Sequence, residues 1–496
     1  MRDILLGVDV GTTLVKAAAY DSDGAMIASH TVPAASRHPS NTWSEQDMGE
    51  IWHSVCVCLR HLSDKVDTRR IKSLGLCAQG DGLWMLGPDG EPNGPAMLWN
   101  DTRAAEVVLA KPSQERNRAV AKACHTANWP GTAGSLFLWL KENDPERAAN
   151  CTFIVCCADW IGLKLTGVLA TDHCDASIPF MDLATRRWSV ETLEAFGLDV
   201  EQMPSVQRAD TPLGALTQSA AQATGLPQGL PIATGTLDLG AMIVGLGMCK
   251  PGAAMMVLGT TAVLNLLTGR IDPDLTPVGA TVLHPTSDLF IRVLAPTSGV
   301  QAINWFVGLH PVSLGGDNAE EKAKKLNKLV NKAPVGSNGV VFLPFLNGER
   351  APFVAPQARG AFHGLTPQSG IAEMGRAVME GAAFSLRHCF HAQGGLPDDP
   401  VWLSGGGAKN HLWCDIIADV MGVPVMVSEN SDHGLWGAAC IGASAIDASD
   451  PCKIAARQEH KREHIPNPAN HEKYNRAYAR YQAIVETSKA IWDTLQ

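Results

Sequence analysis

Two similar strand–turn–strand segments, placed half the chain apart, constrain the fold of this protein more than any other feature of its sequence. Residues 6–24 are LGVDVGTTLVKAAAYDSDG, and residues 253–270 are AAMMVLGTTAVLNLLTGR. In both segments an apolar strand ends at a Gly-Thr-Thr turn, and a second apolar strand follows. The turns begin at Gly11 and Gly259, half of the 496-residue chain apart. This spacing predicts a duplicated domain, with one copy of the unit opening each half.

The Gly-Thr-Thr turns have two interpretations. Each can be an ordinary β-hairpin turn, or each can bind phosphate, because short glycine and threonine turns expose backbone N–H groups and hydroxyls to an anion. Glycine also lets the backbone approach the anion closely. Two facing turns would hold a triphosphate between the halves. We expect the first turn to use Gly11, Thr12 and Thr13, and the second to use Gly259 and Thr260.

Only the first of the two units carries a carboxylate. Asp9 interrupts its first strand, whereas Val257 stands at the corresponding position of the second unit. One carboxylate beside phosphates suits Mg²⁺, which takes waters and phosphate oxygens as its other ligands. We therefore predict that Asp9 binds Mg²⁺. Lys16, just past the first turn, either adds positive charge near the phosphates or only closes the hairpin, and both roles stay open.

Strands and helices alternate along both halves of the chain, which predicts layered α/β domains. The spacing of apolar residues favours a helix at 48–66, a strand at 71–82 and a long amphipathic helix at 471–495. A chain of 496 residues is too long for a single core. We place the boundary after residue 245, which gives domains of residues 1–245 and 246–496.

Composition excludes several classes of protein. The net charge of -10 argues against broad binding to nucleic acids or anionic membranes. Charged residues and prolines interrupt the long apolar runs, which predicts neither a secretory signal nor a membrane-spanning helix. The thirteen cysteines lack metal-binding spacing and suit free thiols in a reducing compartment, so we expect a cytoplasmic protein. A homodimer is compatible with the sequence, which does not define the oligomeric state.

Five segments resemble motifs of the FGGY family of carbohydrate kinases. They are Asp9–Thr13, FLPFLNGERAP at 342–352, GAFHGLTPQSGIAEMGRAVME at 360–380, SGGGAKN at 404–410 and LWGAACIGA at 435–443. These motifs run from near the N-terminus to about residue 443, so the resemblance covers nearly the whole chain. It implies two duplicated ribonuclease-H-like domains, as in actin and hexokinase, with a cleft between them.

The resemblance also implies an activity, the transfer of the γ-phosphoryl group of ATP to a hydroxyl of a small sugar or polyol. The catalytic base of the family corresponds to Asp238, which ends an apolar strand in TGTLDLGA. A carboxylate flanked by so much apolar sequence is costly unless it is used, although capping of the following helix is the other interpretation. The glycine-rich motif implies that Gly406, Gly407, Ala408 and Asn410 contact the adenosine side of ATP.

The same resemblance places the sugar beside WSEQD at 43–47, QGDG at 79–82 and WNDTRA at 99–104. The residues that we expect to bind it are Gln79, Gly80, Asp81, Asp101, Arg103 and Asp238. In the alternative interpretation the charged residues of this set pair with each other, and Trp43, Trp84 and Trp99 belong to the core.

The substrate is less tightly defined than the chemistry. QGDG replaces the Gln-Met-His-Gly of xylulokinases and resembles the erythritol kinase and keto-gulonate kinase branches. The expected substrate is a short open-chain ketose or polyol, of the xylulose or erythritol type. A sugar acid of the 3-keto-gulonate type would need a cationic partner, for which Arg103 is the candidate. The alternative outside enzymes is a non-catalytic, actin-like sugar sensor that binds nucleotide, and the retained Asp9 and Asp238 disfavour it.

Overall fold

The computed structural model describes residues 3–110, 113–271, 278–428, 432–457 and 461–495. The strands of the first half are β1 (Ile4–Val10), β2 (Leu14–Asp21), β3 (Met26–Pro33), β4 (Glu45–Gln46), β5 (Ile71–Ala78), β6 (Trp84–Leu86), β7 (Ala96–Met97), β8 (Phe153–Val155), β9 (Ala170–Asp172), β10 (Met181–Asp182), β11 (Arg187–Trp188), β12 (Ser205–Gln207), β13 (Pro212–Ala215), β14 (Pro231–Ala233) and β15 (Thr236–Leu237). The strands of the second half are β16 (Ala254–Leu258), β17 (Ala262–Thr268), β18 (Ala280–Leu283), β19 (Phe290–Leu294), β20 (Val341–Leu343), β21 (Ala361–His363), β22 (Val401–Ser404), β23 (Val425–Ser428) and β24 (Lys461–His464).

The helices of the first half are α1 (Met48–Ser63), α2 (Ala105–Leu109), α3 (Ser113–Cys124), α4 (Ala133–Asn143), α5 (Pro145–Ala149), α6 (Cys157–Thr166), α7 (His173–Ala176), α8 (Val190–Ala195), α9 (Gln218–Thr224) and α10 (Asp238–Gly245). The helices of the second half are α11 (Val300–Leu309), α12 (Pro311–Leu314), α13 (Ala319–Val330), α14 (Ile371–His391), α15 (His411–Met421), α16 (His433–Asp447), α17 (Pro451–Ala455) and α18 (Pro468–Trp492).

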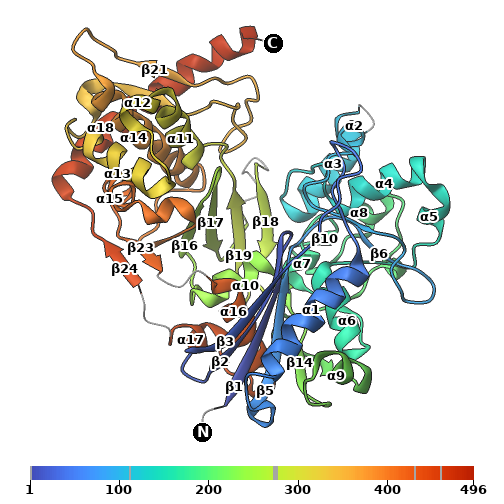
Figure 1. Ribbon diagram of the computed structural model, residues 1–496. Helices are drawn as coiled ribbons and strands as arrows, with labels where there is room; N and C mark the ends of the chain where they lie inside the picture. The colour runs from blue at the N-terminus through green and yellow to red at the C-terminus, as the bar shows by residue number, and fades with distance from the viewer. Residues whose placement is uncertain (1–2, 111–112, 272–277, 429–431, 458–460, 496) are drawn as a thin grey trace.

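Two seven-stranded sheets organise these elements, one in each half of the chain. The first has the order β13-β14-β5-β1-β2-β3 with β15 also beside β5, and the second has the order β18-β19-β17-β16-β22-β23-β24. Figure 1 shows α11 to α15 and α18 gathered on one side, α2 to α8 on the other, and the first sheet below them. The α/β class predicted from the sequence is confirmed.

Each sheet contains one of the two repeated strand–turn–strand units. In the first unit β1 pairs with β2 in antiparallel fashion, and β1 also pairs in parallel with β5. In the second unit β16 pairs with β17 in antiparallel fashion and in parallel with β22. The two units thus have the same neighbours in their sheets, which confirms the predicted duplication of this unit.

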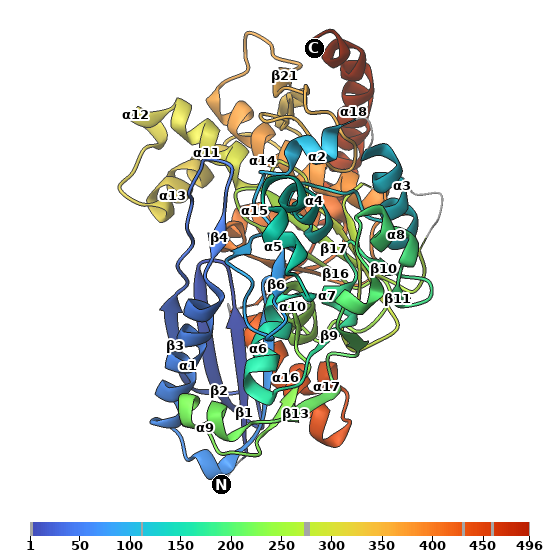
Figure 2. The same ribbon diagram turned by 90° about the vertical axis from the view of Figure 1, so that its right-hand side faces the viewer.

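Strand β1 is buried on both of its faces. Leu6 and Val8 join the apolar cluster beneath α1, whereas Leu5 joins a cluster with Trp436 of α16. Successive residues of a strand face opposite sides of the sheet, so helices from opposite ends of the sequence enclose β1. Figure 2 shows α1 running along β2 and β3. This double burial explains why β1 is apolar almost without interruption.

Helix α16 reaches this position through very close backbone contacts. A Cβ added at Gly7 of β1 would lie 2.1 Å from the carbonyl oxygen of Leu435, and one added at Gly437 would lie 1.8 Å from that of Ala241 in α10. Only glycine fits at such separations. A helix of the second half therefore packs on the first sheet, and the domain boundary after residue 245 stays a prediction.

The individual elements largely match those expected from periodicity. The helix expected at 48–66 is α1, the strand expected at 71–82 is β5 without its last four residues, and the C-terminal helix begins three residues early, at Pro468. All thirteen cysteines are free thiols. Among the described residues, no helix combines the length and apolarity that crossing a membrane requires.

Candidate active site

Three neighbouring parallel strands of the first sheet end together. Strands β1 and β15 lie on either side of β5, and the register places both Asp9 and Thr236 opposite Cys77. Asp9 is the penultimate residue of β1, Asp81 follows β5 by three residues, and Asp238 follows β15 directly. The carboxyl ends of parallel strands are where α/β folds place their ligands. The structure thus brings three of the predicted site residues to one edge.

Two electrostatic interactions join the three carboxyl groups, one between Asp81 and Asp238 and one between Asp238 and Asp9. Burial raises the pKa of Asp81 to about 7, and the charge of Asp238 adds to this effect. Burial raises the pKa of Asp238 to about 7 as well, reinforced by Asp9 and opposed by the N–H of Leu239. Burial also raises the pKa of Asp9 to about 6, although Lys16 opposes the shift. Carboxyl groups with such pKa values exchange protons near neutral pH, which suits general base catalysis.

The Asp238 side chain has many protein atoms around it and is still accessible to solvent. Its side chain is exposed, yet protein atoms surround it closely enough to raise its pKa. It is the first residue of α10, and its Oδ1 accepts a 2.6 Å hydrogen bond from the N–H of Leu239. Leu237 occupies the N-cap position, so the capping interpretation of Asp238 is wrong in detail. The start of the helix orients the carboxylate while leaving it open to a ligand.

Thr12 connects the first Gly-Thr-Thr turn to the loop after β5. Its hydroxyl donates a 2.9 Å hydrogen bond to Oε1 of Gln79 and accepts one of 3.1 Å from Nε1 of Trp99. Nε2 of Gln79 in turn donates to Oε1 of Gln46. Gln79 is almost fully buried. The hydrogen bond between Thr12 and Gln79 thus holds the turn and the loop after β5 together. Thr13, the next residue of the turn, is exposed.

Trp99 lies beside the first Gly-Thr-Thr turn, and the sequence did not separate it from the core tryptophans. Its side chain is 47% exposed and is held in place by Thr12, whereas Trp84 is fully buried. The core interpretation is therefore right for Trp84 and wrong for Trp99. No local pattern distinguishes the two, because the exposure of Trp99 depends on the turn that it contacts.

Lys16 forms an ion pair that neither interpretation of the sequence included. Its Nζ lies 2.8 Å from Oδ1 of Asp432, the residue before α16. Helix α16 also approaches Asp9, since a Cβ at Gly434 would lie 3.9 Å from Oδ2 of that residue. Lys16 thereby links the first unit to the second half of the chain while its charge still acts on Asp9.

Asp101 and Arg103 bind each other, as the alternative interpretation held. Nε and Nη2 of Arg103 lie within 3.0 Å of the Asp101 carboxylate, and Nη2 also donates to Oε1 of Glu45 at 2.7 Å. The guanidinium stacks 4.0 Å above the ring of Trp43, and the Arg103 side chain is only 2% exposed. A buried pair engaged in this way holds the 43–46 loop, so we assign neither residue a direct contact with substrate.

The second Gly-Thr-Thr turn is supported by the start of α11. The N–H groups of Val300 and Gln301 donate to the carbonyl oxygens of Gly259 and Thr260, at 2.9 and 3.1 Å. The Thr260 side chain is exposed. Two backbone hydrogen bonds thus hold the turn in place, and the Thr260 side chain is accessible to solvent.

The glycine-rich loop that follows β22 lies at the same edge of the second sheet, since β22 is the parallel neighbour of β16. Gly406 is exposed, and a Cβ there would meet no atom within 4 Å. Gly407 and Ala408 are buried. The Asn410 side chain caps α15 and pairs with the amide of Asn327. Of the four residues predicted to contact the nucleotide, Gly406 is the one that is solvent-exposed with free space beside its backbone.

We expect Asp81→Asn to stabilise the fold at alkaline pH. The pKa of Asp81 lies near 7 in the folded state against 3.8 ordinarily, so between pH 4 and 7 the folded chain holds a proton that the unfolded chain releases. Wild-type stability therefore falls as pH rises through this window. Asparagine does not titrate, and it adopts the φ of +55° found at this position.

The melting temperature of Asp81→Asn should equal that of the wild type near pH 4 and exceed it by roughly 2 °C at pH 8. Asp89→Asn, in an exposed turn, is the matched control and should leave the curve unchanged. A constant difference between Asp81→Asn and wild type across this pH range would contradict the assigned shift.

A two-domain fold with one such unit in each sheet and carboxylates at the strand ends defines the ribonuclease H-like architecture of actin-like ATPases and sugar kinases. The models of the FGGY family of carbohydrate kinases match residues 4–245 with the N-terminal domain and residues 254–446 with the C-terminal domain. The chain therefore belongs to the FGGY family of carbohydrate kinases.

Named relatives cover nearly the whole chain. An erythritol kinase of Brucella abortus is 29% identical over 99% of this chain and 98% of its own length. A xylulose kinase of Escherichia coli is 29% identical over 99% of both chains. The crystal structure of a "xyloylose kinase" from Brucella ovis superposes with a TM-score of 0.89 at 26% identity, over 98% of this chain and all of that one. The protein is thus a carbohydrate kinase, and the resemblance inferred from its motifs is confirmed.

Proposed function

We propose that this kinase transfers the γ-phosphoryl group of ATP to a hydroxyl of a short open-chain ketose or polyol, with Asp238 as general base. The observation that carries the proposal is the set of carboxyl groups Asp9, Asp81 and Asp238, with raised pKa values, at three adjacent strand ends. A carboxyl group with a pKa near 7 is about half ionised at neutral pH, so a substantial fraction can accept a proton.

In the proposed reaction Asp238 accepts the proton of the attacking hydroxyl as its oxygen bonds to the γ-phosphorus. The bond from that phosphorus to the bridging oxygen breaks, and ADP leaves. Asp81 and the backbone of Gly80 bind further substrate hydroxyls, Gln79 holds their loop, and the exposed ring of Trp99 covers the carbon chain. Phosphoryl transfer depends mainly on such positioning and on neutralising charge.

The phosphates of ATP are proposed to lie against the two Gly-Thr-Thr turns, where Thr13 and Thr260 are exposed, and the adenosine side beside Gly406. Asp9 fits a role in binding Mg²⁺. Burial and the charge of Asp432 raise its pKa because they disfavour the ionised carboxylate, and a bound cation would stabilise that ionised form. One carboxylate is sufficient for an ion that keeps waters and phosphates as ligands. Mg²⁺ would neutralise charge on the phosphates.

Asp9→Asn should raise the Mg²⁺ concentration that gives half-maximal rate by about tenfold or more, because the carboxylate contributes charge as well as an oxygen. The measurement is a Mg²⁺ titration of ADP release at saturating ATP and sugar. Val257→Ala, at the corresponding position of the second unit, is the control and should titrate like the wild type. An unchanged titration for Asp9→Asn would remove Asp9 from the metal site.

The sugar-acid alternative loses its expected recognition group. Arg103 is buried and already pairs with Asp101 and Glu45, so it does not supply a cation for a substrate carboxylate. The set of groups left at the strand ends is acidic or neutral, which favours an uncharged polyhydroxy compound.

A screen of ADP release by the full chain across ketopentoses, tetritols, glycerol and sugar acids tests the proposal directly. We expect turnover with a ketopentose or a tetritol and little with sugar acids. Preferred turnover of a sugar acid would overturn the substrate assignment. Nucleotide binding without ADP release on any member would favour the non-catalytic sensor.

A further inference from the structure

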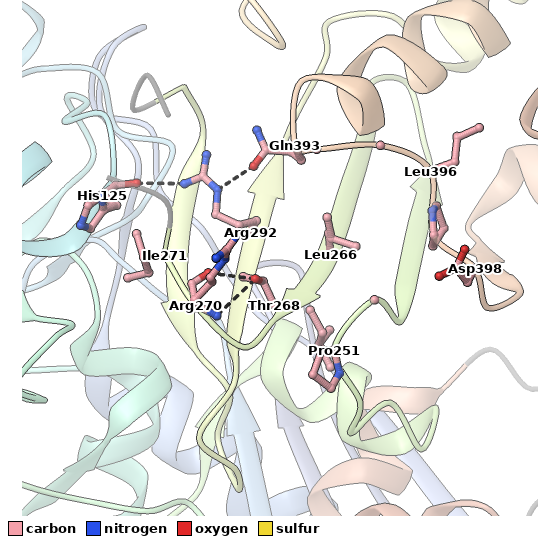
Figure 3. A pocket seen from close by; sticks show the side chains of 15 residues that line it. His125, Pro251, Leu266, Thr268, Arg270, Ile271, Arg292, Gln393, Leu396 and Asp398 are labelled. Carbon is pink, nitrogen blue, oxygen red and sulfur yellow. Dashed lines mark hydrogen bonds between the residues drawn. The ribbon is translucent and has the colours of Figure 1, made fainter. Parts of the chain in front are cut away.

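A cavity lies beside the end of β17 that is away from the Gly259–Thr261 turn. It has a volume of about 370 Å³. Its walls come from both halves of the chain: His125 follows α3, and the other lining residues come from the loop before β16, from β17 and the residues that follow it, from β19 and from the loop after α14. Figure 3 shows His125, Arg270 and Arg292 near one end, with Asp398 beyond Leu266 at the other.

Arg292 is a buried cation without a carboxylate partner in the described ranges. It is 5% exposed, and its four hydrogen bonds go to uncharged oxygens: the carbonyls of His125 and Val278, the hydroxyl of Thr281 and the amide of Gln393. Burial lowers its pKa to about 10, with no acidic group opposing the shift. A buried charge that is not neutralised is costly, and an arriving anion offsets the cost.

Arg270 adds a second positive charge to the same cavity. Its side chain is exposed and forms no ion pair with any residue that the structure describes. The rest of the wall is mixed: Pro251, Leu266, Leu267, Ile271, Leu396 and Pro397 are apolar, Thr268 and Gln393 are polar, and the carboxylate of Asp398 lies at the end away from the arginines. Two arginines beside a partly apolar wall, in a chain whose net charge is -10, suit a small anion with a carbon skeleton.

We propose that this cavity binds a small organic phosphate monoester, of the size of a pentose phosphate. Its phosphate would lie between Arg270 and Arg292, and its carbon chain along Leu266 and Ile271. A guanidinium group can donate two parallel hydrogen bonds to two oxygens of one phosphate. A cavity of this volume accommodates a ligand of that size. Because Nη1 of Arg292 donates to the carbonyl oxygen of His125, an occupant would contact a hydrogen bond that joins the two halves.

Calorimetric titration of the full chain with ribose 5-phosphate, inorganic phosphate and gluconate tests the site. We expect ribose 5-phosphate to bind more tightly than the other two, with affinity reduced about tenfold or more in Arg270→Ala and binding at this site lost in Arg270→Glu. Arg359→Ala, an exposed arginine outside the cavity, is the matched control and should bind as the wild type does.

Titration curves of Arg270→Glu that superpose on the wild type would overturn the proposal. Gluconate binding as tightly as ribose 5-phosphate would overturn the assignment to phosphate. Turnover without added phosphate ester should be the same in Arg270→Ala and wild type, because Arg270 lies outside the proposed active site. The test therefore remains valid whichever sugar the kinase uses.

Hydrogen exchange locates the binding independently of the variants. Ribose 5-phosphate should protect backbone amides at 123–127, 266–271 and 391–398, which line or adjoin the cavity. Protection confined to the loops around Asp9 and Asp238 would place the ligand in the active site instead and contradict the proposal.

Discussion

Asp238→Asn should lower kcat by about 10²–10⁴-fold while leaving the binding of ATP and sugar nearly unchanged. Asparagine preserves the shape of the side chain and can still accept the hydrogen bond from Leu239, so the start of α10 is undisturbed. It cannot take up the proton of the attacking hydroxyl. The measurements are steady-state ADP release and calorimetric binding of each substrate.

Asp81→Asn is the informative comparison for this variant, because Asp81 is the other carboxyl group with a pKa near 7 at the same edge. We expect Asp81→Asn to raise KM for the sugar and to keep kcat within about tenfold of the wild type. If Asp81→Asn instead abolishes kcat while Asp238→Asn retains it, the roles of the two residues are exchanged. Asp238→Glu, which keeps a carboxylate but displaces it, should retain more activity than Asp238→Asn.

Gly437→Ala should destabilise the fold by about 3 kcal/mol, a large effect for a single methyl group. The new Cβ would lie 1.8 Å from the carbonyl oxygen of Ala241, which belongs to the backbone of α10 and cannot rotate away. The two helices must therefore separate. Because α10 begins at Asp238 and the Asp432–Lys16 pair precedes α16, activity should fall together with stability.

Gly308→Ala, in α11, is the matched control, because its added Cβ meets no atom within 4 Å. Alanine is favoured over glycine inside a helix by about 1 kcal/mol, so this variant should be as stable as the wild type or more stable. Thermal and urea unfolding of both variants provide the comparison. A Gly437→Ala protein that unfolds like the wild type would show that α16 and α10 are not packed as described.

The positions of the carboxylates at the strand ends were predictable because they follow from local sequence patterns. An apolar run that stops at a carboxylate marks the end of a buried strand, and this held for Asp9 and Asp238. The roles of these residues as metal ligand and base remain predictions. Asp101, Arg103 and Asn410 are also of residue types that commonly bind ligands. Only the structure shows that their side chains instead form hydrogen bonds with other residues of the protein.

The sequence by itself determined the α/β class, the duplicated strand–turn–strand unit and the family, since these depend on short-range periodicity and on motifs of adjacent residues. Only the tertiary structure decided that Lys16 pairs with Asp432, that Trp99 is exposed whereas Trp84 is buried, and that α16 packs on the first sheet. It also brought Arg270 and Arg292 to one cavity. Such contacts join residues distant along the chain, and their energies depend on burial and separation, which no local pattern encodes.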